Sequence, residues 1–306
     1  MKELATPRAM IRAMVQGVSP PRPLLLPIVF SLGARLENVS LRAFLGNPTK
    51  IANALRQIRN VLPLDGVSCY FDPYLEAEAL GCEVTWNADD SSRILHPLNT
   101  DVATLRDRLR SPQDVVERGR IPVACEVVRR LKMMLPGEPA LVAVVTGPHA
   151  LAAQLTGDVQ DAESNSCEMV EFAAEITAVM CRTFLDAGAS VIFLRESAPA
   201  VEDYQHWAEL LSPVVSVIRF YEALPVLLPC GGISEDALAA LDIACEGLVC
   251  PGMIDLTSEN NSAQVMASRA GSSVLTTQDD IPADADVKQL APWLGFCLPD
   301  RGRRRE

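Results

Sequence analysis

The sequence has few aromatic residues and an excess of acidic over basic residues, and each shortage excludes a class of protein. Aromatic residues make up only 5% of the 306 residues, too few for the aromatic platforms on which nucleic-acid bases stack. The 27 Lys and Arg residues against 39 Asp and Glu give a net charge of −12, which opposes binding to nucleic acid or to anionic membranes. We therefore expect no nucleic acid and no membrane among the partners.

The nine cysteines also lack the spacing of metal-binding or redox motifs. No C-x-x-C is present, and most cysteines stand in apolar segments such as GLVC and AVMC, where a thiol behaves as a small hydrophobic group. There is no signal peptide and no apolar run of about 18 residues or more. These shortages predict a soluble cytoplasmic protein without disulfides.

Short apolar runs alternate with longer helical patterns along most of the chain. The runs are nearly continuous in apolar residues, which is typical of parallel strands buried on both faces. They cover residues 24–31, 66–72, 140–146, 190–195, 225–230, 246–250 and 273–278. The helical patterns cover residues 48–60, 102–109, 113–135, 165–187 and 234–243. This alternation predicts an α/β fold built of βαβ units.

Such a series of strands fits a closed barrel or an open doubly wound sheet. No G-x-G-x-x-G follows a strand, which disfavours the dinucleotide-binding form of the open sheet. Residues 82–95 alternate in polarity and predict a hairpin. We expect a helical extension over residues 1–22, a barrel over 23–298 and a basic tail over 299–306.

The polar residues that follow each apolar run are the candidates for a functional site, because the active site of a barrel lies at the carboxyl ends of its strands. In chain order these residues are Ser31 and Arg35; Asp72, Tyr74, Glu76 and Glu78; His149; Arg195 and Glu196; Cys230 and Gly231; and Asp279 and Asp280.

Five separated blocks resemble the uroporphyrinogen decarboxylase superfamily. They are FDPYLEAEALGCEV (71–84), VVTGPHALAAQL (144–155), DAGASVIFLRES (186–197), LLPCGG (227–232) and VLTTQDDIPADADVKQL (274–290). The resemblance covers roughly residues 20–295 and implies a (β/α)8 TIM-type barrel.

The match is poor at the residues that hold the substrate of the haem-pathway decarboxylase. That enzyme has RQAGR after its first strand, and the two arginines bind carboxylates. Here SLGAR places Ser31 at the first arginine and Arg35 at the second. Pro73 stands where its FSDIL motif has Asp, with Asp72 one residue earlier. A lyase acting on a smaller carboxylate, held by Arg35 and Arg195, is the alternative that keeps this chemistry.

The EAEALG block is instead similar to the corrinoid-dependent methyltransferase branch. Zinc-dependent members of that branch have H-x-C-G after strand five and a second Cys after strand eight, and zinc activates the acceptor thiol. Here Leu228 stands at the histidine position, Cys230 matches the first cysteine, and Asp279 stands at the second. The alternatives are a substitute zinc set of His149, Cys230 and Asp279, or a site without metal.

The resemblance implies a methyltransferase that moves a methyl group between a methylated corrinoid on a partner protein and a small acceptor, such as a pterin or another non-thiol. Its expected catalytic residues are Glu196, Cys230 and Asp279. Its expected substrate-binding residues are Ser31, Arg35, Asp72, Tyr74, Glu76, Glu78, His149, Arg195 and Gly231. The structural alternatives are a buried thiol at Cys230, a salt bridge at Glu196, and helix-capping acids elsewhere. A catalytically degenerate binding subunit is a third interpretation.

The chain is short between its sixth strand and its last. Residues 251–271 fill a space in which the family has a further strand and helix. They can hold one helix but show no clear strand, so we expect strand seven to be short or missing. Because an incomplete barrel exposes strand edges, we also expect a homo-oligomer or a partner that covers them.

Overall fold

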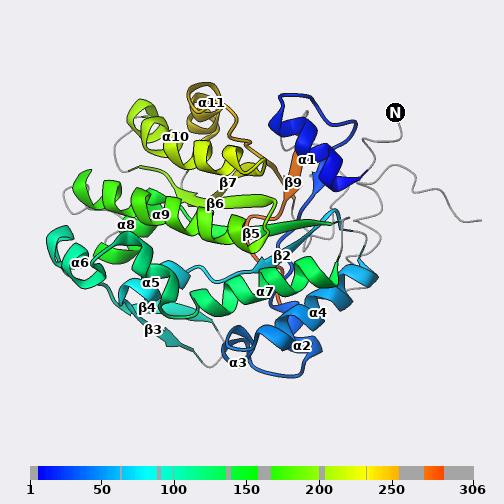
Figure 1. The fold of residues 1–306 in the computed structure, drawn as a ribbon, viewed down its shortest axis with the longest axis horizontal. Helices are drawn as coiled ribbons and strands as arrows, with labels where there is room; N and C mark the ends of the chain where they lie inside the picture. The colour runs from blue at the N-terminus through cyan, green and yellow to red at the C-terminus, as the bar shows by residue number, and fades with distance from the viewer. Residues whose placement is uncertain are drawn as a thin grey trace, which may run out of the picture.

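The computed structural model describes residues 6–62, 64–87, 91–98, 100–135, 139–157, 167–199, 204–231, 233–254 and 272–285. Parallel strands occupy the centre and helices cover the outside (Figure 1), which confirms the predicted α/β class. The tail predicted at 299–306 lies outside the described residues. No helix in these ranges is long and apolar enough to cross a membrane.

The central strands form two parallel sheets. The larger sheet has the order β2 (Gly66–Tyr70), β5 (Ala140–Thr146), β6 (Val191–Ser197) and β7 (Leu224–Gly231). The smaller sheet has the order β1 (Leu24–Leu25), β9 (Val274–Thr276) and β8 (Gly252–Met253). Every pair within these two sheets is parallel.

Backbone contacts join the two sheets at both sides. Val226 of β7 forms a parallel bridge with Val249, which lies just before β8. On the other side, the N–H of Asp65 donates to the Leu25 carbonyl of β1 at 3.2 Å, directly before β2 begins. The buried Asp65 carboxylate also accepts the Leu25 N–H at 2.9 Å and pairs with Arg22. The strands therefore follow one another in a circuit, as in a TIM-type barrel.

The sixth and last strands of this circuit are direct neighbours. Gly252 of β8 lies opposite Leu275 of β9, and Met253 lies opposite Thr276. Among the described residues no strand stands between them, in agreement with the prediction that strand seven is short or missing. Residues 255–271, where a helix was expected, lie outside the described residues.

Two predicted strands differ from the structure. The apolar run 24–31 is a strand only at Leu24–Leu25, because Pro27 has no N–H and later N–H groups bond to side chains. The sixth strand lies slightly later than predicted, since its pairing starts at Val249 and continues at Gly252–Met253. The predicted hairpin is confirmed, with β3 (Glu83–Trp86) antiparallel to β4 (Ser92–His96).

Side chains cap the first N–H groups of several outer helices. Asn47 caps α4 (Pro48–Val61), Asp101 caps α6 (Val102–Leu109) and Ser234 caps α11 (Glu235–Ala244). The pattern at 113–135 is a 3-10 helix, Pro112–Glu117, followed by α7 (Ile121–Met134). The remaining helices are α1 (Pro7–Val15), α2 (Leu32–Leu36), α3 (Leu41–Leu45), α5 (Leu75–Leu80), α8 (Pro148–Thr156), α9 (Cys167–Ala187) and α10 (Tyr204–Phe220).

A cluster of aromatic rings supports the turn that follows β1. The rings of Phe30 and Phe44 lie 5.3 Å apart between centroids, and those of Phe30 and Tyr70 lie 5.4 Å apart. All three side chains are buried, and the Tyr70 hydroxyl donates to the Leu45 carbonyl at 2.9 Å. The chain from β1 into α2 therefore rests on a rigid base.

Candidate functional site

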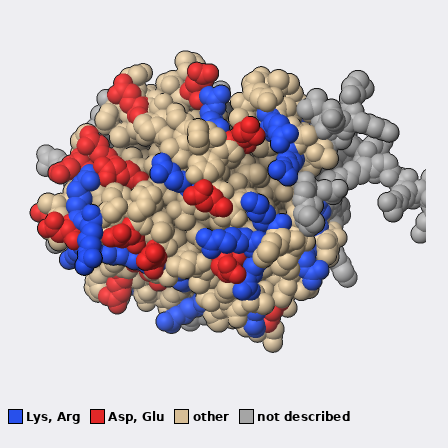
Figure 2. Space-filling model, viewed as in Figure 1, with Lys and Arg blue, Asp and Glu red and all other residues tan. Residues whose placement is uncertain are grey.

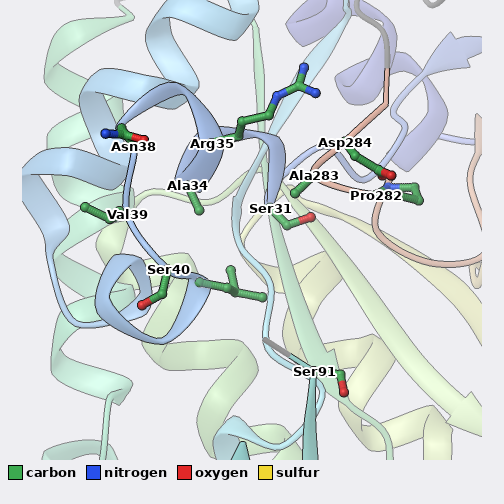
Figure 3. Close-up of a pocket in the computed structure, with 11 residues that line it drawn as sticks. Ser31, Ala34, Arg35, Asn38, Val39, Ser40, Ser91, Pro282, Ala283 and Asp284 are labelled. Carbon is green, nitrogen blue, oxygen red and sulfur yellow. The ribbon is translucent and has the colours of Figure 1, made fainter. Parts of the chain in front are cut away.

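A pocket of about 860 Å³ opens beside the carboxyl end of β1. Figure 3 shows side chains from the start of α2, from the loop at 38–40 and from the segment 282–284 after β9 around this hollow. The lining residues are Ser31, Ala34, Arg35, Asn38, Val39, Ser40, Leu41, Ser91, Pro282, Ala283 and Asp284. Ser31 and Arg35, both predicted as site residues, thus lie in one wall of this pocket.

Asp280 holds the two walls of this pocket together. Its carboxylate accepts the N–H groups of Phe30 at 2.7 Å and Ser31 at 2.8 Å, and the Ser31 hydroxyl donates to the Ile281 carbonyl. Burial raises the pKa of Asp280 to about 6, although these hydrogen bonds act in the opposite direction. Arg35 donates to the carbonyl of Ala285 at 2.9 Å, which leaves part of its guanidinium available to a ligand.

Cys230 lies near the carboxyl end of β7, within electrostatic reach of Arg195, Glu196 and Asp279. Burial raises the pKa of its thiol, the positive charge of Arg195 lowers it, and the two carboxylates raise it. Cys230 is therefore a neutral thiol at pH 7. Asp279 is exposed, Arg195 and Cys230 are half-buried, and Gly231 pairs with Ser197 at the end of the neighbouring strand.

Glu196 follows Arg195 on β6 and is fully buried. Its carboxylate accepts the N–H groups of Ala150 at 2.8 Å, Ser197 at 2.9 Å and His149 at 3.3 Å. Burial raises its pKa to about 7, while these donors lower it. Ala150 and His149 belong to the first turn of α8, so Glu196 caps that helix. The structural alternative for Glu196, a salt bridge to Arg35 or to another arginine, is absent from the described contacts. Its carboxylate accepts backbone N–H groups, and the Trp207 side chain also lowers its pKa.

His149 turns its ring toward Trp207 of α10. The ring centroids are 6.1 Å apart in an edge-on arrangement, and the Nε2 atom of His149 is buried without a hydrogen-bond partner among the described residues. Burial lowers the pKa of His149 to about 4, and the charge of His206 adds to the effect. His149 is therefore a neutral imidazole at pH 7, and its Nε2 atom has a hydrogen-bonding capacity that no described residue uses.

The acids after β2 fall into two separate contacts. Asp72 and Glu78 both pair with Arg120, at 2.6 Å and 2.8 Å, and the guanidinium of Arg120 also lies 5.7 Å from the ring centroid of Trp86. Burial raises the pKa of Asp72, and the charge of Arg120 opposes this. The Tyr74 N–H donates to Asp72 at 3.0 Å, so Tyr74 contributes its backbone here.

Glu76 points instead into the space between β5 and α9. The hydroxyl of Thr146 donates to its carboxylate at 2.7 Å, and Thr177 of α9 donates to the Thr146 carbonyl. Glu76 is almost fully buried, and burial raises its pKa to about 7. This contact joins α5 to β5 and leaves Glu76 with no exposed surface for a substrate.

The donor set for zinc does not fit this chain. No group of three His, Cys, Asp or Glu side chains within the described ranges could hold a metal ion, and this includes the predicted set of His149, Cys230 and Asp279. Leu228, at the histidine position of the zinc-dependent relatives, is fully buried among apolar residues. No catalytic step is therefore assigned to zinc.

Arg120 and Trp207 contact candidate site residues but could not be identified from the sequence. Arg120 stands before α7, far from any strand end, and nothing in its local sequence indicates that it pairs with Asp72. Trp207 lies on α10, a helix that the apolar pattern did not reveal and that contains Pro213. A tryptophan followed by apolar residues at helical spacing was the only available signal.

Comparison with known proteins places this geometry in a family. The fold is similar to that of a methyltransferase from Methanosarcina mazei, with a TM-score of 0.75 and 15% identity over 95% of this chain and 98% of that chain. A methylated-thiol–coenzyme M methyltransferase from Methanosarcina mazei is 30% identical over 87 residues, which are 28% of this chain and 23% of that protein. A uroporphyrinogen decarboxylase from Phenylobacterium zucineum is 24% identical over 227 residues, which are 69% of this chain and 63% of that protein.

The matched segments thus span less than two thirds of the length of both curated relatives. A sequence profile described as uroporphyrinogen decarboxylase matches residues 6–248, well over half of the chain. The chain therefore belongs to the uroporphyrinogen decarboxylase family.

Proposed function

We propose that this protein is a methyltransferase that moves a methyl group between a methylated corrinoid on a partner protein and a small acceptor. The group formed by Arg195, Cys230 and Asp279 at the carboxyl ends of β6, β7 and β9 carries the proposal. The similarity to a thiol methyltransferase over 87 residues supports it.

In this reaction a lone pair on the acceptor forms the new bond to the methyl carbon. The bond between that carbon and the donor breaks, and its electron pair stays with the donor. An acceptor that carries a proton loses it to a base, and the exposed carboxylate of Asp279 is placed to receive it. Because the displacement is in line, holding donor and acceptor in position contributes more than acid–base chemistry.

The local charges favour some roles over others. Arg195 can hold an anionic group of the acceptor, or favour the deprotonated acceptor. Cys230 is a neutral thiol, so it contacts the acceptor rather than attacking the methyl group. With no zinc set in the described residues, an acceptor that needs no metal-bound thiolate, such as a pterin, fits best.

Methyl transfer can be measured with free methylcobalamin as donor and a panel of thiols and reduced pterins as acceptors, by following the cobalamin absorbance. We expect Arg195→Gln and Asp279→Asn each to reduce kcat/KM by about tenfold or more, since each removes a charged contact. Asp107→Asn on α6, an exposed carboxylate away from the strand ends, is the matched control and should match wild type. Failure of every acceptor, or equal activity in all variants, would overturn the proposal.

A second function is favoured by one observation. Arg35 lines the 860 Å³ pocket with part of its guanidinium available, as a lyase acting on a carboxylate would need. Release of CO2 from a small carboxylate, lost in Arg35→Gln, would support the lyase, for which Arg195 is the second candidate to hold the carboxylate. If neither reaction is detected, the result favours the interpretation that the protein is a catalytically degenerate binding subunit.

A further inference from the structure

A second cavity lies at the end of the barrel opposite the pocket beside β1. This crevice has a volume of about 280 Å³. Its walls include Arg8, Ile11 and Arg12 of α1, Lys132 near the end of α7, and Ser190 just before β6. Since it adjoins the amino-terminal ends of β5 and β6, it is separate from the strand ends used in the proposed function.

Positive charge gathers in this crevice although the chain carries a net charge of −12. Arg8, Arg12 and Lys132 are all exposed, and none forms an ion pair with another described residue. Glu222 is the one acidic side chain among the lining residues. Figure 2 shows several Lys and Arg side chains in the region between α1 and α7.

Helix stability alone does not explain this arrangement. Arg12 and Lys132 lie in the last turns of their helices, where a positive charge complements the helix dipole. Arg8 lies in the first turn of α1, where the dipole disfavours a positive charge. Arg8 and Arg12 are also four residues apart on one helix face, so they repel each other. An anion between them would remove both penalties.

The neighbouring backbone and hydroxyl are arranged to admit such an anion. Gly188 leaves room for the Lys132 side chain, because an ideal Cβ at Gly188 would lie 3.1 Å from both Cε and Nζ of Lys132 and closer still to its Cδ atom. The Ser190 Oγ accepts the Leu141 N–H at 3.1 Å, so its own proton is free to donate. Two guanidinium groups, one ammonium group and the Ser190 hydroxyl thus line the same small space, together with Tyr221 and Glu222.

We propose that this crevice binds a phosphate-type anion, as free phosphate or as the phosphate group of a small ester, through Arg8, Arg12 and Lys132. Arginine and lysine are the side chains that bind phosphate most effectively, and the space accepts one phosphate group with a small substituent. The anion bridges α1 to α7, so it stabilises the amino-terminal helix on the barrel. The site thereby couples the position of α1 to the concentration of that anion.

Titration calorimetry and thermal unfolding of the full chain with inorganic pyrophosphate, inorganic phosphate and glycerol phosphate test the proposal, with sodium chloride at equal ionic strength as reference. We expect saturable binding and a raised Tm. The double variant Arg8→Gln, Arg12→Gln should bind at least tenfold more weakly, and Lys132→Gln several-fold more weakly. Arg56→Gln, an exposed arginine of α4 outside the crevice, is the control and should bind as wild type does.

Equal affinities for all variants, or a Tm that follows ionic strength alone, would overturn the proposal. Binding only to vesicles that contain phosphatidic acid, with no affinity for the soluble anions, would also overturn it. Glutamine keeps a good helix propensity, and unfolding midpoints without ligand show whether each variant is folded. If the double variant does not fold, Lys132→Gln alone decides. None of these measurements depends on methyl transfer, so the proposed function and this site can fail independently.

Discussion

The carboxylate of Glu196 accepts the backbone N–H of Ala150 at 2.8 Å, which ties the end of β6 to the first turn of α8. The same carboxylate accepts two more N–H groups, so its hydrogen-bonding capacity is used inside the protein. The sequence identified Glu196 as a catalytic candidate because it stands at a strand end. Its contacts describe a capping residue that helps to build the site.

Replacing Glu196 should therefore reduce stability. We expect Glu196→Ala to lower the free energy of unfolding by about 3 kcal/mol, since one buried and two partly buried N–H groups lose their acceptor. Glu196→Gln keeps one acceptor oxygen and should cost about half as much. Urea unfolding followed by circular dichroism measures both, with Glu209→Ala on the exposed face of α10 as control. A Glu196→Gln protein of full stability but without activity would instead indicate a catalytic acid.

Gly147 is expected to be required by the same contact. An ideal Cβ at Gly147 would lie 2.5 Å from Glu196 Oε2, although its backbone angles of φ −75° and ψ 169° suit any residue. Gly147→Ala should destabilise the protein by about 1–3 kcal/mol through this overlap. Gly46→Ala is the control, because the nearest atom to its Cβ would be 3.9 Å away. In a Glu196→Ala background the cost of Gly147→Ala should fall, because only the 3.1 Å contact with the Glu196 Cβ remains, and full additivity would contradict the steric explanation.

Arg120 should contribute more to the free energy of unfolding than an exposed arginine in a similar ion pair does. Its partner Asp72 has a side chain that is only 1% exposed, so Arg120→Gln leaves a buried carboxylate uncompensated. We expect a loss of about 3 kcal/mol, partly recovered in the double variant with Asp72→Asn. The loss should be smaller at pH 5 than at pH 8, because Asp72 without Arg120 takes up a proton more readily. Arg106→Gln, which breaks an exposed pair with Glu175, should cost less than about 1 kcal/mol.

Glu76 gives the protein a defined pH dependence. Burial raises its pKa from 4.5 to about 7, so the folded state binds its proton more tightly than the unfolded state does. Its contribution to stability is therefore highest below about pH 4.5 and decreases as the pH rises through 7, by up to about 3 kcal/mol. Glu76→Gln should remove this pH-dependent part of the free energy of unfolding. The stability of the variant should therefore rise relative to that of wild type between pH 5 and 8. Glu83→Gln is the control. A difference in the free energy of unfolding between Glu76→Gln and wild type that stays constant across that range would refute the raised pKa of Glu76.

The strands and their order could largely be predicted, because apolar runs report burial directly. Residues 66–72 and 140–146 became β2 and β5, and the direct pairing of β8 with β9 agrees with the prediction, from the short spacing at 251–271, that strand seven is short or missing. The partners of the polar residues could not be predicted in the same way. Asp72 finds its cation 48 positions away at Arg120, and Phe30 finds its acceptor at Asp280, contacts that only folding creates. Position at a strand end does not reveal which side chains face the pocket.

The direct pairing of β8 with β9 also sets the size of the barrel. Omitting one strand shortens the circumference by one inter-strand spacing, about 4.8 Å, and barrel diameter scales with strand number. An eight-stranded interior is only just wide enough for its own side chains, so a narrower one has no room for a ligand along its axis. Substrates must then be received at the rim, and the pocket beside β1 lies there rather than over the centre.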